Sequence, residues 1–143
     1  MDDSAPRRGP GAFQWNAGGW FGSQLGSTCW LLLTGSLLVP ERPQVGLAVL
    51  ACGLLPNLIG LRLWQLRRRI EPYPALQSLL LILWGFTVLA VLVLDVSGAR
   101  LPALGAPPQD PTTLYWVLLL FPVLMGMFHL KERAARRRGG APG

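Results

Sequence analysis

Apolar residues gather along this chain in four long runs, separated by short segments of Pro, Gly and charged residues. The runs cover about residues 20–39, 45–64, 75–94 and 113–130. Each is close to the roughly 20 residues that a helix needs to cross the hydrocarbon core of a bilayer. The pattern predicts an all-α fold, an integral membrane four-helix bundle surrounded by lipid.

The polar segments before the first run and after the last run divide the chain into three parts. Residues 1–14 are polar and rich in Pro and Gly, which predicts a disordered cytoplasmic N-terminus. Residues 15–130 form a single four-span transmembrane domain, in which the short connection at 40–43 makes the first two helices an antiparallel hairpin. Residues 131–143 form a basic cytoplasmic tail that extends the fourth helix until Gly139, Gly140 and Pro142 end it.

Charge adds an orientation to this architecture. Only 14% of the residues are charged, against about 25% in a typical soluble domain. With four spans, ten basic residues fall on one side of the membrane, whereas Arg42 and Arg100 fall on the other. Because the side rich in Lys and Arg faces the cytoplasm, both termini are predicted to be cytoplasmic.

The same charges narrow the possible partners. Although the net charge is +6, the basic residues lie at span ends, so the sequence favours a lipid bilayer and not nucleic acid. The Arg, Ala, Gly and Pro bias suggests a bacterial protein of the inner (plasma) membrane. A basic set near the inner leaflet either contacts anionic lipid, at ~1 kcal/mol per residue, or only anchors the topology. This set comprises Arg67, Arg68, Arg69, Lys131, Arg133, Arg136, Arg137 and Arg138.

Glycine spacing predicts two surfaces where helices approach closely. In the first run Gly18, Gly22 and Gly26 are four residues apart, and in the second run Gly46, Gly53 and Gly60 are seven apart. Small residues at such spacings allow close contact between membrane helices. The simplest hypothesis is that the two surfaces meet within the hairpin. The alternative is that one of them binds another membrane protein or a second copy of the chain.

Polar residues within the runs form a second candidate site. Gln24 and Thr28 on the first helix and Asn57 on the second lie at similar depths below the cytoplasmic boundary. Pro56 leaves the carbonyl of Cys52 without its usual donor, and Asn57 or Thr28 is expected to meet that loose group. The cluster is either structural, joining the two helices, or a polar binding or permeation site. Trp30 and Trp84, near the middle of their runs, need partners in the bundle or contact lipid at some cost.

Motifs of catalysis and metal binding are absent from the sequence. Cys29 and Cys52 belong to no Cys/His pattern, so no metal site, catalytic residue or cofactor is predicted. Small multidrug transporters resemble this chain in size and number of spans. They depend on a carboxylate within the first helix, and no Asp or Glu lies deep in any run here. Proton-coupled export is therefore poorly supported.

These observations predict a small multi-pass membrane protein with no enzymatic activity of its own. Its expected role is that of an accessory subunit or interaction component. The alternative is a small transporter or channel that uses Gln24, Thr28 and Asn57.

Overall fold

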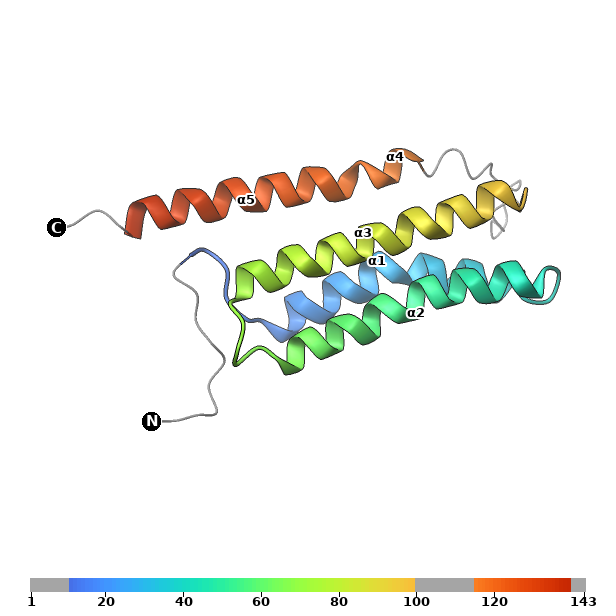
Figure 1. Ribbon diagram of the computed structural model, residues 1–143, viewed down its shortest axis with the longest axis horizontal. Helices are drawn as coiled ribbons and strands as arrows, with labels where there is room; N and C mark the ends of the chain where they lie inside the picture. Colours follow the sequence, from blue (N-terminus) through green and yellow to red (C-terminus); the bar gives the residue numbers. More distant parts are fainter. Residues whose placement is uncertain (1–10, 100–114, 140–143) are drawn as a thin grey trace.

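The structure is a computed structural model that describes residues 11–99 and 115–139. All regular structure in these two ranges is helical (Figure 1). The helices are α1 (Ala17–Leu38), α2 (Pro43–Gln65), α3 (Pro72–Val96), α4 (Tyr115–Leu118) and α5 (Leu120–Gly139). The all-α class predicted from the sequence is confirmed for this part of the chain.

Local sequence explains where the helices begin and end. Asn16 caps α1 by accepting a hydrogen bond from the N–H of Gly19 at 3.1 Å. Pro43 and Pro72 stand at the first positions of α2 and α3, where the missing amide costs nothing. At the end of α3, Gly98 has a φ of 60° and Ala99 N–H bonds back to the Leu94 carbonyl at 3.1 Å. This is a Schellman cap, which requires a residue that tolerates positive φ.

Packing joins α1, α2 and α3 into one unit and leaves α5 at its side. The hairpin of α1 and α2 contacts α3, while α5 contacts only α3 and α4 among the described helices. Figure 1 shows α5 lying along α3, away from α2. The arrangement therefore differs from a closed four-helix bundle, since the last helix has a single neighbour along most of its length.

Apolar side chains cover the outside of this unit. The buried positions of α2 are mostly small, including Gly46, Gly53 and Gly60, whereas most of its leucines are exposed. Leu47, Leu54 and Leu58 are 59%, 52% and 61% exposed. This is the reverse of a helix in water, which buries its large apolar residues.

Length and composition make α2 and α3 able to cross a membrane. Their mean hydropathies over the best windows are 1.8 and 2.6, and only 33% and 39% of those windows are buried. A core helix of a soluble protein would be mostly buried, so these two helices indicate membrane association. The other two long helices, α1 and α5, do not reach the hydropathy of a membrane span by the same measure. In α1 the cause is its Gly, Ser and Gln residues, and in α5 it is the basic second half.

The predicted fourth span is interrupted and extended. The structure breaks the helix at Leu119 and then continues it through α5 to Gly139, beyond the predicted span end at residue 130. Pro122 explains the break, because it has no N–H to donate to the Leu118 carbonyl one turn earlier. The indole Nε1 of Trp84 donates to that carbonyl at 3.1 Å. Trp84 thus has the partner that its depth was expected to require.

Candidate functional sites at the basic end

Three helix ends lie together at one end of the molecule, and α5 runs past them. The start of α1, the end of α2 and the start of α3 lie together toward the left of Figure 1, and the last turns of α5 extend beyond them. Arg67, Arg68 and Arg69 follow α2 here, and the basic residues 131–138 lie on the last part of α5. Arg42 lies at the opposite end, where its guanidinium donates to the Ser97 carbonyl at 2.7 Å. The described residues thus show the predicted charge asymmetry, while Arg7, Arg8 and Arg100 lie outside the described ranges.

An N-terminal strap, residues 11–16, crosses this basic end. The N–H of Ala12 donates to the carboxylate of Glu132 on α5 at 2.8 Å, and Gly11 lies against the same carboxylate. Residues 11–14 belong to the segment predicted to be disordered, and in the structure they have a defined place. Residues 1–10 of that segment lie outside the described residues.

Glu132 is the anchor of the strap. It is only 3% exposed, and its carboxylate also accepts a hydrogen bond from Arg136 Nε at 2.8 Å. That hydrogen bond raises the pKa of the Arg136 guanidinium above its ordinary value. Arg136 also reaches Glu71 at the start of α3, 3.6 Å away. No sequence pattern singles out Glu132, because one acidic residue within a basic run resembles a solvated surface charge.

Aromatic side chains fasten the strap on both sides. Phe13 lies 5.3 Å from Phe128 and 5.8 Å from Tyr73 between ring centroids. Trp15 lies 5.0 Å from Trp20 and 5.5 Å from Trp64. Each of these contacts joins the strap to a different helix, so the strap ties α1, α2, α3 and α5 together at this end.

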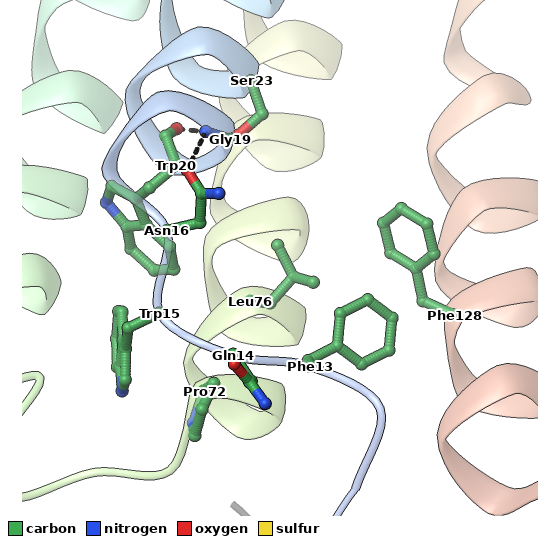
Figure 2. A pocket seen from close by; sticks show the side chains of 10 residues that line it. All are labelled: Phe13, Gln14, Trp15, Asn16, Gly19, Trp20, Ser23, Pro72, Leu76 and Phe128. Carbon is green, nitrogen blue, oxygen red and sulfur yellow. Dashed lines mark hydrogen bonds between the residues drawn. The ribbon is translucent and has the colours of Figure 1, made fainter. Parts of the chain in front are cut away.

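A cavity of about 220 Å³ lies beneath the strap (Figure 2). Figure 2 shows Phe13 and Phe128 pointing toward each other at one side of it, with Asn16 capping Gly19 at the other. Its lining is mainly apolar and comes from the strap, α1, α3 and α5. The indole N–H of Trp15, which also lines the cavity, is buried without a hydrogen-bond partner among the described residues.

A second hollow, the basic groove, lies between the start of α3 and the last turns of α5. Its volume is about 750 Å³. It is lined by Glu71, Tyr73, Pro74, His129, Glu132, Arg133, Arg136 and Arg137. Three members of the predicted lipid-contact set, Arg133, Arg136 and Arg137, therefore share one groove. The other five members do not line it.

The predicted polar cluster lies between α1 and α2, with Gln24 and Thr28 buried and Asn57 half-buried. Asn57 Nδ2 donates to Thr28 Oγ1 at 2.7 Å, and Thr28 donates to the backbone carbonyl of Gln24 at 2.8 Å. Asn57 also bonds to the carbonyl of Gly53 at 2.7 Å, one residue beyond the Cys52 carbonyl that was expected to receive it. The structure thus brings Thr28 and Asn57 into direct contact.

Gln24 joins this interface through Gly60 and not through Asn57. Its side chain is 2% exposed, and its carboxamide occupies the space where a Cβ on residue 60 would be. Trp20 Nε1 donates to the Gly60 carbonyl at 3.1 Å. Gln24 Nε2 is buried without a hydrogen-bond partner in the described part of the chain.

The two glycine surfaces do not meet, so the simplest hypothesis for them is wrong. Gly46 approaches Val39 and Gly35, and Gly53 approaches Leu31 and Leu32, so the α2 surface packs against α1. A Cβ on Gly22 or Gly26 would meet nothing within 4 Å, and one on Gly18 would meet only Asn16 of its own cap. Gly18, Gly22 and Gly26 therefore face away from α2, because α1 uses Gly35 and its buried Gln24, Thr28 and Leu31 for the contact.

The described residues form no metal site, and their two cysteines are free. Among residues 11–99 and 115–139, no three His, Cys, Asp or Glu side chains gather as metal ligands would. Cys52 is buried and Cys29 is exposed, both as free thiols. In comparisons with known proteins, no family model, no curated protein and no solved structure matches this chain.

Proposed function

We propose that this chain is a bacterial inner-membrane protein that crosses the bilayer four times, with both termini in the cytoplasm. In this proposal it works as an accessory or interaction component and has no enzymatic activity of its own. α1, α2 and α3, each with 22 to 25 residues, measure about 33 to 38 Å at 1.5 Å per residue, enough for a hydrocarbon core of about 30 Å. α4 and α5 together supply the fourth crossing.

The observation that carries the proposal is the distribution of small and large apolar residues. Leucines cover the outside of α2, while glycines and polar groups lie between the helices. In lipid, leucine gains nothing from burial, and small residues let helix backbones pack closely. The clustering of basic residues at one end supports the cytoplasmic placement of that end.

The proposed role as an interaction component rests on surfaces left without a neighbour. No other described helix contacts the outward glycines of α1, which are Gly18, Gly22 and Gly26. Most of the circumference of α5 is also without a helix neighbour among those described. Small-residue surfaces of this kind favour contact with another transmembrane helix. The partner is therefore either another membrane protein or a second copy of this chain.

Topology and partnership are tested separately. One reporter that is active only outside the cytoplasm and another that is active only inside it are fused to the chain. Fusions after Pro43 and after Gly105 should be active only with the outside reporter, and fusions after Arg69 only with the inside reporter. Detergent extraction followed by affinity capture and mass spectrometry should recover a membrane protein whose level falls when this chain is deleted. Cytoplasmic activity of the Pro43 fusion would refute the topology.

The alternative, a transporter or channel, would place its substrate at Gln24, Thr28 and Asn57. The cavity and the groove described above are lined by other residues, and Thr28 and Asn57 satisfy each other. A Cys29→Ser variant leaves Cys52, beside this cluster, as the single thiol. Protection of Cys52 from a thiol reagent by a solute would favour transport over the accessory role.

A further inference from the structure

The basic groove combines positive charge with neutral hydrogen-bond donors. His129, Arg133 and Arg137 are four residues apart on α5, so they lie on one side of the helix. Tyr73, at the start of α3, forms the facing wall together with Glu71. Two helices therefore supply the walls, and their separation is held by the contact of Tyr73 with Phe13 and His129.

Positive charge is in excess within the groove. The two carboxylates are occupied, since Glu132 accepts from Ala12 N–H and Arg136, and Glu71 pairs with Arg136. Arg133 and Arg137 are exposed, and within the described ranges neither has an acidic partner. Their guanidinium groups are the donors best suited to a phosphate.

Tyr73 and His129 add a defined hydrogen-bond arrangement. Gln77 Nε2 donates to the Tyr73 hydroxyl oxygen at 3.3 Å, and that hydroxyl lies 2.8 Å from His129 Nδ1. The arrangement is satisfied when the Tyr73 hydroxyl donates to Nδ1, which leaves the proton of a neutral imidazole on Nε2. His129 then supplies a donor that no residue of the chain uses among those described.

We infer that this groove binds the phosphate headgroup of an anionic phospholipid. The inference rests on the proposed membrane topology, which places this end of α5 at the level of the inner-leaflet headgroups. Leu130 lies beside the groove on α5 and Met127 lies on the membrane side of it; both are strongly exposed, and a Cβ on Gly126 would meet nothing. Acyl chains therefore have an exposed apolar surface on the same helix as the charged groove, which a soluble phosphate ester would not use.

The test compares two variants that lose the same charge at the same end. Arg133→Gln with Arg137→Gln removes the two groove arginines that have no acidic partner among the described residues and leaves Arg136 in place. Arg68→Gln with Arg138→Gln removes two arginines that do not line the groove. Full-length protein is purified in a neutral detergent, and binding of phosphatidylglycerol and of phosphatidylcholine is measured by native mass spectrometry. Inorganic phosphate and glycerol phosphate are added as competitors. Thermal unfolding in lipid-free detergent checks that each variant is folded.

Wild-type protein should prefer phosphatidylglycerol. The groove variant should lose about 25-fold of that preference, since each of its two missing arginines contributes roughly fivefold to partitioning onto anionic lipid. The control variant should lose less than threefold. An equal loss in both variants would overturn the inference and leave the proposed function intact. The same holds if wild-type protein shows no lipid preference but still shows four-span topology in the reporter assay. Displacement of the lipid by millimolar phosphate would also overturn it.

Discussion

At residue 60 the backbone of α2 lies directly against the carboxamide of Gln24. A methyl group there would overlap the Gln24 amide and disturb the bond from Trp20 to the Gly60 carbonyl. Gly60→Ala is therefore expected to destabilise the protein by about 1–3 kcal/mol, the usual cost of overpacking a close contact. The midpoint of thermal unfolding in detergent measures this effect.

Two further variants make the explanation specific. Gly26→Ala adds the same methyl group where nothing lies within 4 Å, so its midpoint should match that of the wild type. Gln24→Ala should relieve the overlap, so the double variant should unfold at a higher temperature than Gly60→Ala alone. Equal midpoints for Gly60→Ala and Gly26→Ala would show that the contact is unimportant.

Asn57 and Thr28 form a side-chain hydrogen bond between α1 and α2 in apolar surroundings. Asn57→Leu is expected to cost about 0.6 kcal/mol, and at most about 2 kcal/mol, because interhelical hydrogen bonds in membranes are modest. A double-mutant cycle with Thr28→Val, read by unfolding midpoints, isolates the pair. Strictly additive effects would mean that the two side chains do not interact.

Part of this interface can be predicted from the sequence. Equal depth along two antiparallel helices was enough to associate Thr28 with Asn57, because depth in a membrane follows from residue count. It could not associate Gln24 with Gly60, since rotation about the helix axis decides which side chain meets a glycine. The same rotation turns Gly22 and Gly26 outward, which spacing alone does not reveal.

At the scale of elements, the join between α4 and α5 depends on a bond from another helix. Trp84 donates to the Leu118 carbonyl that Pro122 leaves without its usual donor. Trp84→Phe should therefore increase hydrogen exchange around residues 118–123 and destabilise α5 by about 1–2 kcal/mol. Pro122→Ala restores an intrahelical donor, so in that background Trp84→Phe should have a much smaller effect. The same effect in both backgrounds would contradict this account.

The strap depends in a similar way on Glu132. Glu132→Ala removes the acceptor of the Ala12 N–H and frees Arg136, so the amides of residues 12–15 should exchange at least about tenfold faster, as expected for a local opening. Hydrogen exchange with mass spectrometry measures this region. Glu41→Ala, at the opposite end of the molecule, serves as the control. Unchanged exchange after Glu132→Ala would show that the aromatic contacts alone hold the strap.

The sequence predicts the helices better than it predicts which helices and segments contact one another. Four apolar runs predicted the helices because α-helix is the simplest structure that satisfies every backbone polar group in lipid. The place of residues 11–16 could not be predicted in this way. Their place depends on contacts of Phe13 with Phe128 and of Ala12 with the buried Glu132. These partners are more than 100 residues away in sequence and come close only after the helices have packed.

For the whole molecule, the open arrangement of helices separates two kinds of glycine. Gly53 is an internal contact, because a Cβ there would lie 3.2 Å from the Leu31 Cβ and 2.8 Å from Leu32 Cδ2. Gly22 faces away from the other described helices. A bulky side chain at these two positions should therefore have opposite consequences for folding and for association.

Gly53→Ile is expected to separate α1 from α2 and to abolish a stable, monodisperse protein in detergent, because the backbones at this contact cannot move apart without losing the interface. Gly22→Ile should unfold at the wild-type temperature yet lose the partner, or the second copy, that cross-linking in membranes captures. Loss of stability in Gly22→Ile would show that the α1 surface is internal. Stable Gly22→Ile protein with full cross-linking would instead indicate that the interaction surface lies on α5, where Leu120, Val123, Met127 and Leu130 are exposed.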